Sequence, residues 1–286
     1  MSKFTVACVQ TNSKPDPEVN IAEVSPMIRE AKAAGADFIT TPEIVGMFEP
    51  DKAAARAKAK LEEEHEVLIA FRGLAAELGV WLHAGSLSVK LTDDERLANR
   101  SFLIAPDGSI AARYTKIHMF DVQVGDGQTY RESASYRPGE EGVLAETPWG
   151  TFGLTICYDI RFPYLYRSLA QAGAKVLFAP AAFTKVTGEA HWHVLQRARA
   201  IENGCFVISA AQCGTHSKGR QTYGHSIIVA PWGEVLADGG EEPGIITAEI
   251  DLAKVDEARG KVPSLTHDRE FAGPNHYGAA LREAGE

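Results

Sequence analysis

Three side chains of different chemistry follow three predicted strands of this sequence: Glu43, Lys116 and Cys157. Cys157 ends an apolar run, and polar residues come directly after it: Tyr158, Asp159 and Arg161. A thiol where a strand meets a helix lies near free backbone N–H groups, which favour the thiolate over the thiol. We therefore interpret Cys157 as a nucleophile. A buried structural cysteine is the alternative, because free cysteine packs as a small hydrophobe.

These three residue types suit the hydrolysis of an amide. Cys157 would attack the carbonyl carbon and form a thioester, which divides one difficult step into two easier ones. Glu43 would take the thiol proton as general base and return it to the departing amine as general acid. Lys116 and the backbone N–H of Tyr158 would bind the oxyanion of the tetrahedral intermediate. Glu43 and Lys116 have opposite effects on the pKa of Cys157. The carboxylate raises this pKa, and we expect the ammonium group to offset the rise.

An internal repeat predicts the elements that position these residues. Residues 33–42 (AAGADFITTP) and 171–180 (QAGAKVLFAP) both end a helix at Gly, continue as a strand and stop at Pro. Two further pairs of segments correspond in the same way: residues 77–84 with 202–209, and 101–110 with 226–235. The last pair contains Pro-Asp-Gly and Pro-Trp-Gly, which suit hairpin turns. Each half is thus predicted to run strand, helix, strand, helix, strand, hairpin.

Two such halves predict an α/β fold with two mixed sheets, each covered by helices on one face. The uncovered faces must be buried against each other, which gives a four-layer αββα sandwich. We expect one domain over residues 1–286, with a C-terminal extension from about residue 260. The charged residues 51–66 are predicted to form an exposed helix. Ligands gather beyond the carboxyl ends of strands in such sheets, where Glu43 and Cys157 are predicted to lie.

Composition excludes several classes of protein. Lys and Arg number 29 and Asp and Glu 38, so the formal charge of −9 and the absence of a basic run argue against nucleic acid as a partner. No apolar run approaches the ~18 residues of a membrane span, and the first residues do not form a signal peptide. We expect a cytoplasmic protein whose four cysteines are reduced, with no disulfide framework and no zinc knuckle.

Three motifs carry a resemblance to a known family: Pro42-Glu43, Lys116-Ile-His-Met-Phe-Asp121 and Cys157-Tyr-Asp-Ile-Arg-Phe-Pro163. Together they resemble the nitrilase superfamily of carbon–nitrogen hydrolases over nearly the whole chain. Three further segments are similar to the Nit-type amidases within it: Gly188-Glu-Ala-His-Trp192, Arg197-Ala-Arg-Ala-Ile-Glu202 and Tyr223-Gly-His-Ser226.

The resemblance implies an αββα fold, no metal or organic cofactor, and homodimers or homotetramers. It implies that Glu43 is the base, Lys116 the oxyanion residue and Cys157 the nucleophile. Glu132 looks like the second glutamate that positions Lys116 or the substrate. The implied substrate is a small amide that carries a carboxylate, with deaminated glutathione first. The alternatives are α-ketoglutaramate or α-ketosuccinamate, as for an omega-amidase, and an N-carbamoyl compound.

The expected pocket has several further residues. Phe183 and Thr184 follow a predicted strand and should form one wall, beside Tyr158. His191 is also expected to line the pocket. Among the basic residues near its mouth, Arg161 is the preferred partner for a substrate carboxylate because it lies four residues after Cys157, with Lys185, Lys218 and Arg220 as other candidates.

Other interpretations compete with this one. A metal site at His191 and His193 lacks a third ligand at useful spacing. A papain-like hydrolase would not explain Glu43 and Lys116. Cys157 could instead be a redox sensor, which would oxidise without releasing an amine. A catalytically silent interaction module would leave Glu43, Lys116 and Cys157 together by coincidence.

Overall fold

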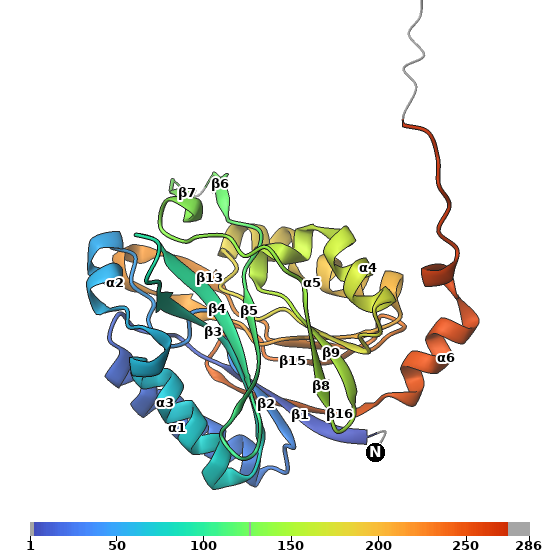
Figure 1. The fold of residues 1–286 in the computed structure, drawn as a ribbon, viewed down its shortest axis with the longest axis horizontal. Coiled ribbons are helices and arrows are strands. Elements are labelled where there is room, and N and C mark those ends of the chain that lie inside the picture. The colour runs from blue at the N-terminus through green and yellow to red at the C-terminus, as the bar shows by residue number, and fades with distance from the viewer. Residues whose placement is uncertain (1–2, 126, 274–286) are drawn as a thin grey trace, which may run out of the picture.

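The computed structural model describes residues 3–125 and 127–273, which form two six-stranded sheets packed face to face between helices (Figure 1). The first sheet contains, in spatial order, β16 (Gly244–Asp251), β1 (Lys3–Gln10), β2 (Phe38–Thr40), β3 (Trp81–Lys90), β4 (Leu97–Ile104) and β5 (Ile110–Thr115). The second contains β15 (Val235–Asp238), β14 (Ile227–Val229), β11 (Phe206–Ser209), β10 (Val176–Phe178), β9 (Gly150–Leu154) and β8 (Val143–Thr147).

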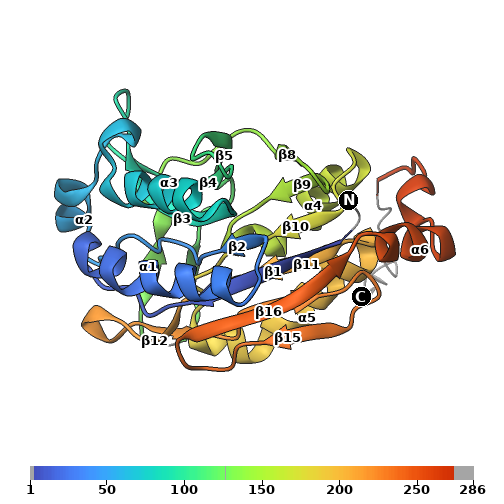
Figure 2. The same cartoon turned by 90° about the horizontal axis from the view of Figure 1, so that it is seen from below.

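The two sheets have the same internal order, which confirms the predicted repeat. Strands β1, β2 and β3 are parallel neighbours, as are β9, β10 and β11. An antiparallel hairpin completes each series, β4–β5 in the first sheet and β14–β15 in the second. The remaining edge strands are β16, which pairs antiparallel with β1 (Figure 2), and β8, which pairs antiparallel with β9.

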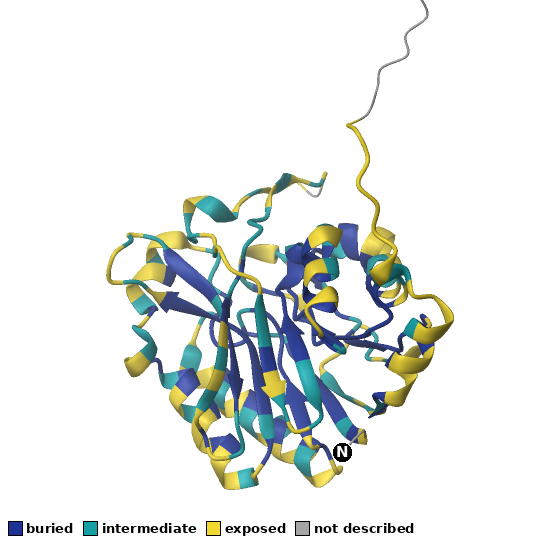
Figure 3. Cartoon of the chain, turned by 45° about the vertical axis from the view of Figure 1, so that its right-hand side comes forward, coloured by how far each residue is buried: buried dark blue, intermediate teal, exposed yellow. Residues whose placement is uncertain are grey.

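Helices cover the outer face of each sheet, so the predicted four-layer αββα sandwich is also confirmed. Helices α1 (Pro17–Ala33) and α3 (Glu66–Leu78) lie on the first sheet, where their apolar residues pack against β1 and β2. Helices α4 (Pro163–Gln171) and α5 (Lys185–Asn203) lie on the second. Exposed residues gather on the outer helices and in loops, whereas most strand residues are buried (Figure 3).

Aromatic side chains join the two sheets. The rings of Phe38 on β2 and Phe178 on β10 stack with their centroids 4.9 Å apart. The ring centroids of Phe4 on β1 and Phe152 on β9 lie 5.6 Å apart. All four rings are buried, so apolar contacts between equivalent strands of the two halves hold the sheets together.

The single exposed helix predicted over residues 51–66 is wrong. Helix α2 (Lys52–Lys58) ends at Ala59, which has an extended backbone, and Lys60 then forms a bridge with Val89 of β3. A short turn, η1 (Glu62–Glu64), leads into α3. Burial of Ala59 and backbone pairing with the sheet outweigh the helical preference of this charged stretch, which sequence composition does not reveal.

The remaining elements are short strands and turns around the ends of the sheets. They are β6 (Asp121–Gln123), β7 (Thr129–Arg131), η2 (Glu132–Ala134), η3 (Cys157–Arg161), β12 (Cys213–Thr215), η4 (Ser217–Gly219) and β13 (Gln221–Tyr223). Among the described residues, none of the helices has the length and apolar character needed to cross a membrane.

The chain after β16 forms α6 (Ala253–Lys261) and η5 (Ser264–Thr266). Arg167 of α4 donates a hydrogen bond to the carbonyl oxygen of Ser264 at 2.7 Å, and Gln171 donates to that of Leu265 at 3.0 Å. The first part of the predicted C-terminal extension therefore lies against α4. Its last residues, 274–286, lie outside the described part of the chain.

Candidate active site

A cavity of about 500 Å³ contains all three residues singled out by their chemistry. Glu43 comes three residues after β2, Lys116 directly follows β5, and Cys157 begins η3 after β9. Two of these positions correspond to carboxyl ends of parallel strands, and the third to the end of a hairpin. The twofold repeat therefore brings together residues that are far apart in the sequence.

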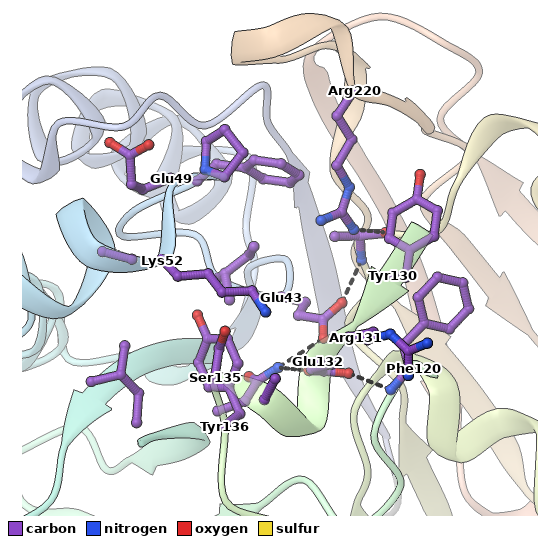
Figure 4. Close-up of a pocket in the computed structure, with 18 of the residues that line it drawn as sticks. Glu43, Glu49, Lys52, Phe120, Tyr130, Arg131, Glu132, Ser135, Tyr136 and Arg220 are labelled. Atoms are coloured by element: carbon purple, nitrogen blue, oxygen red, sulfur yellow. Dashed lines mark hydrogen bonds between the residues drawn. The ribbon is translucent and has the colours of Figure 1, made fainter. Parts of the chain in front are cut away.

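Two carboxylates, Glu43 and Glu132, line the cavity around Lys116 (Figure 4 labels both glutamates). The Nζ of Lys116 is 2.8 Å from Glu43 Oε1 and 2.9 Å from both carboxylate oxygens of Glu132, so it lies between the two carboxylates. The Lys116 side chain is only 2% exposed. Burial alone would lower the pKa of Lys116, but Glu132 and Glu43 hold it well above its ordinary value, so the ammonium group stays charged. Glu132 thus lies where the resemblance placed it, beside Lys116.

Glu43 is held by donors on both carboxylate oxygens. Oε1 accepts from Asn99 Nδ2 at 2.9 Å as well as from Lys116, and Oε2 accepts from the backbone N–H of Ala182 at 2.8 Å. Burial by itself would raise the pKa of Glu43, but Lys116 and hydrogen bonds from Cys157 and Ala182 lower it below the ordinary range. Glu43 is therefore a carboxylate that can accept a proton.

Cys157 occupies a tight turn with a left-handed backbone, φ 47°, and its N–H donates to the carbonyl oxygen of Pro180 at 2.9 Å. A non-glycine residue in this region is strained and is commonly found at functional sites. Burial and the charge of Glu43 raise the pKa of the thiol well above its ordinary value, and Lys116 opposes this only in part. The predicted thiolate is therefore wrong, because burial and the Glu43 carboxylate raise the pKa of the Cys157 thiol more than the strand–helix junction and Lys116 lower it.

A buried carboxylate fixes the turn that carries Cys157 to the loop that follows Lys116. Asp159 Oδ1 accepts from the backbone N–H of His118 at 3.0 Å and contacts His118 Nδ1 at 2.7 Å. Its Oδ2 accepts from Tyr114 Oη at 2.7 Å and from the N–H of Ile156 at 2.8 Å. The Asp159 side chain therefore positions both Cys157 and Lys116 by holding together the segments that carry them.

The cavity wall contains some of the predicted substrate-binding residues and not others. Tyr158, Phe183 and Thr184 line the cavity. Arg161 and His191 are not among its lining residues, although the Arg161 guanidinium lies 5.9 Å from the ring centroid of Tyr158 and 5.2 Å from that of Phe183. Their contact with substrate stays a prediction. Arg161 Nη2 lies 3.3 Å from Nδ1 of the exposed His191 on α5, because the two side chains meet outside the cavity.

Arg220, one of the other basic candidates from the sequence, lines the cavity. Its guanidinium lies 4.8 Å from the ring centroid of Phe48 and 5.3 Å from that of Tyr130. Asn99 was not predicted at all, although it donates to both Glu43 and Glu132. The only signal for Asn99 is a polar side chain within an otherwise buried strand.

A separate cluster of His193, His225 and Asp238 brings three groups that could hold a metal within 4.8 Å of one another. The sequence indicated no third group near His193, and the fold supplies two. His193 Nε2 and His225 Nδ1 each lie 2.8 Å from a different oxygen of Asp238. These mutual hydrogen bonds join α5 to β15 and account for the cluster without an ion.

A buried thiol beside a carboxylate and an ammonium group, at the strand ends of an αββα sandwich, defines a class of thiol-dependent hydrolases. Residues 5–260 match the model of the carbon–nitrogen hydrolase family. The chain belongs to this family, within the nitrilase superfamily, and is an enzyme that hydrolyses carbon–nitrogen bonds.

Three relatives illustrate the similarity. Deaminated glutathione amidase of Synechocystis sp. is 42% identical over 274 residues, which cover 93% of this chain and 98% of that protein. The Caenorhabditis elegans NitFhit protein has a crystal structure with a TM-score of 0.88 and 37% identity, covering 94% of this chain and 66% of that chain. Saccharomyces cerevisiae Nit3, from branch 10 of the nitrilase superfamily, has a TM-score of 0.85 and 30% identity, covering 94% and 97%.

Proposed function

We propose that this enzyme is an amidase that cleaves deaminated glutathione through a thioester on Cys157. The observation that carries the proposal is the direct contact of Lys116 with Glu43 beside the Cys157 thiol, inside one cavity. The proposed substrate is inferred from the relative in Synechocystis sp., which is named deaminated glutathione amidase. The similarity covers 93% of this chain and 98% of that protein.

The proposed reaction begins with the thiol and carboxylate forms that the pKa directions favour. Glu43 takes the proton of Cys157 as the sulfur attacks the γ-amide carbonyl carbon. Lys116 Nζ and the backbone N–H of Tyr158 stabilise the resulting oxyanion. The C–N bond then breaks, Glu43 gives its proton to the nitrogen, and cysteinylglycine leaves. The enzyme retains a 2-oxoglutaryl thioester.

Water completes the reaction. Glu43 removes a proton from the water as its oxygen attacks the thioester carbonyl, and the same two donors stabilise the second oxyanion. The C–S bond breaks, sulfur regains a proton from Glu43, and 2-oxoglutarate leaves. Glu132 and Asn99 hold Lys116 and Glu43 in position through both steps, since they donate to or accept from these groups.

The size of the cavity supports a substrate with a sizeable leaving group. The cavity extends from Cys157 to Lys52 and Arg56 on α2, beyond the space that the acyl group needs. Ammonia, the leaving group of α-ketoglutaramate or α-ketosuccinamate, would leave this part of the cavity unfilled. A homodimer or homotetramer and a cytoplasmic location stay predictions.

The test measures cysteinylglycine release from deaminated glutathione and ammonia release from α-ketoglutaramate. We expect no turnover in Cys157→Ala, and losses of about 100- to 1,000-fold in Lys116→Ala and in Glu43→Gln, because each removes a group that acts in the transition state. Cys205→Ala is the matched control, since Cys205 is buried outside the cavity and should leave turnover intact.

Mass spectrometry of enzyme stopped during turnover should find 2-oxoglutaryl bound to Cys157. An unmodified thiol during rapid turnover would remove the thioester from the mechanism. A redox sensor would instead oxidise with peroxide and release no amine from either amide. Turnover of Lys116→Ala at the wild-type rate would exclude Lys116 as the oxyanion donor.

A further inference from the structure

The cluster of His193, His225 and Asp238 takes no part in the proposed reaction and is separate from the residues that line the cavity. His193 is on α5, His225 lies between β13 and β14, and Asp238 ends β15. Helix α5 and strand β15 lie side by side in the second half of the molecule (Figure 2). Three separate segments therefore bring two imidazole nitrogens and a carboxylate oxygen within 4.8 Å of one another.

The donor set suits a late transition metal ion. Imidazole nitrogen is a preferred ligand of zinc, copper and nickel, and zinc also binds two histidines with one carboxylate and a water. Ligand atoms in a tetrahedral zinc site are about 3.3 Å apart. His193 Nε2 and His225 Nδ1 each lie 2.8 Å from an oxygen of Asp238. The hydrogen-bonded atoms are thus the ones that an ion needs, and shifts of about 1 Å would admit it.

Each imidazole can release the nitrogen that now donates to Asp238. Among the described residues, His193 Nδ1 and His225 Nε2 have no hydrogen-bond partner, so either can carry the proton and donate it to water. The side chains of His193, His225 and Asp238 are 35%, 20% and 32% exposed. Solvent can therefore deliver an ion and supply its fourth ligand.

The backbone holds two of the three ligands in place. His225 has a left-handed backbone, φ 54°, which is uncommon for a residue other than glycine and is frequent at functional sites. Its N–H donates to the carbonyl oxygen of Gly240 at 2.6 Å, and its ring stacks on that of Tyr223 with centroids 4.4 Å apart. The N–H of Gly240 donates to Asp238 Oδ1 at 2.9 Å. Little ordering is thus left for a ligand to impose.

The surroundings of the cluster are negatively charged. Burial raises the pKa of Tyr223, and three carboxylates add to the rise: Asp238, Glu189 and Glu241. Lys185 opposes these charges only in part, and it already pairs with Glu241 at 3.4 Å. Three carboxylates against one ammonium group attract a cation to this place.

We propose that His193, His225 and Asp238 bind a divalent transition metal ion of the zinc class, which fastens α5 to β15. The ion would lie behind one wall of the cavity. The carbonyl oxygen of His225 accepts from Trp192 Nε1 at 2.8 Å, and the Trp192 ring lies 5.0 Å from that of Phe183, which lines the cavity. The site therefore braces this wall without touching substrate, whichever amide the enzyme cleaves.

The test measures zinc binding to a protein without a histidine tag that carries Cys157→Ala. This change removes the catalytic thiol, which could otherwise compete for the metal. Calorimetry should find one zinc ion per chain. The Tm should rise by about 4 °C when free zinc exceeds its Kd 100-fold, because the ion binds the folded state. Magnesium should leave the Tm unchanged, since it prefers oxygen ligands.

His193→Gln and Asp238→Asn each remove one ligand, and each should weaken zinc binding at least about 100-fold and abolish the rise in Tm. His191→Gln is the matched control, because His191 is exposed on the same helix and lies outside the cluster. It should bind zinc as tightly as the parent protein. If Asp238→Asn is unstable without metal, His193→Gln decides, since it changes a partly exposed side chain on a helix.

Three results would overturn the site. One is the absence of zinc binding in the parent protein, and another is zinc binding that survives His193→Gln unchanged. The third is an equal rise in Tm with magnesium, which would show only a general attraction of cations to the carboxylates. All of these measurements use the Cys157→Ala protein, so failure of the proposed amidase function would leave them unaffected.

Discussion

At the scale of single residues, the pKa directions of Glu43 and Cys157 explain why the site can stay inactive until an amide arrives. The Cys157 pKa is raised first by burial and then by Glu43, whereas Lys116 keeps Glu43 ionised. The thiol therefore keeps its proton at neutral pH, next to a carboxylate that can accept it. Proton transfer and attack on carbon can then occur together, which protects the sulfur from other electrophiles.

Removing the carboxylate should make the sulfur easier to alkylate while it stops catalysis. Glu43→Gln deletes an anion that raises the pKa of Cys157, so that pKa must fall and the thiolate fraction at a given pH must rise. We expect the midpoint of iodoacetamide alkylation against pH to move downward, as amide hydrolysis is lost. Alkylation rates across a pH series, followed by mass, give this midpoint.

The control for the alkylation experiment is Glu49→Gln. Glu49 also lines the cavity, but it pairs with Lys58 at 2.9 Å and is not among the groups that shift the pKa of Cys157. Its alkylation midpoint should match that of the wild type. A midpoint that stays in place or rises in Glu43→Gln would mean that the carboxylate does not act on the thiol.

At the scale of elements, the turn η3 and the loop after β5 depend on each other through Asp159. Asp159→Asn replaces a carboxylate that accepts from four donors with an amide that has one acceptor oxygen. Because the site is fully buried, donors left unpaired should cost about 2 to 4 kcal/mol of unfolding free energy. Urea denaturation measures this, and turnover should fall with it.

The matched control for Asp159→Asn is Asp256→Asn. Asp256 lies on α6, where it pairs with Lys175 at the surface, and its replacement should change the unfolding free energy by less than about 1 kcal/mol. If the Asp159→Asn protein is as stable as the wild type, water or a rearranged turn replaces the lost acceptor.

The repeat explains which parts of the site could be predicted from the sequence. Glu43 follows β2 and Cys157 follows β9, so each comes after the carboxyl end of a parallel strand, and their convergence follows from the order of the elements in the two halves. The sequence could not predict that Arg220 lines the cavity and Arg161 does not, because the position of a guanidinium at the end of a long side chain depends on packing against rings from distant loops. The fold class was accessible because strand periodicity and glycine positions are local signals.

Other errors have the same physical origin. The break between α2 and η1 arises because Lys60 pairs with β3, a contact between residues distant in sequence. The prediction of a thiolate was wrong because a strand–helix junction in the sequence does not reveal how deeply Cys157 is buried. Burial is the first cause of its raised pKa. Asn99 was missed because its two carboxylate partners come from different loops.

At the scale of the whole molecule, the interface between the sheets contains one histidine with a strongly displaced pKa. His83 on β3 is fully buried, contacts Thr40 Oγ1 at 2.9 Å and Ser101 Oγ at 2.6 Å, and lies against the ring of Phe178. Burial lowers its pKa to about 3. The folded protein therefore keeps His83 neutral at pH values where the unfolded chain would bind a proton.

This difference predicts a loss of stability as pH falls. The contribution of His83 is complete above the ordinary pKa near 6.5 and decreases as pH falls toward 3, by about 2 kcal/mol between pH 7 and pH 5. His83→Gln should remove that part of the change, and the exposed His267→Gln should not. Urea unfolding at both pH values gives the comparison. The same pH dependence in His83→Gln as in wild type would assign the effect to other groups.

The pairing of β16 with β1 has a consequence for synthesis on the ribosome. β1 emerges long before β16, yet the two strands are neighbours in one sheet (Figure 2). Until residue 251 has emerged, the outer edge of β1 offers unpaired N–H and C=O groups to any other nascent chain, and such edges promote aggregation. The edge of β1 therefore stays open until β16 has been made, and products terminated before residue 244 keep it open permanently.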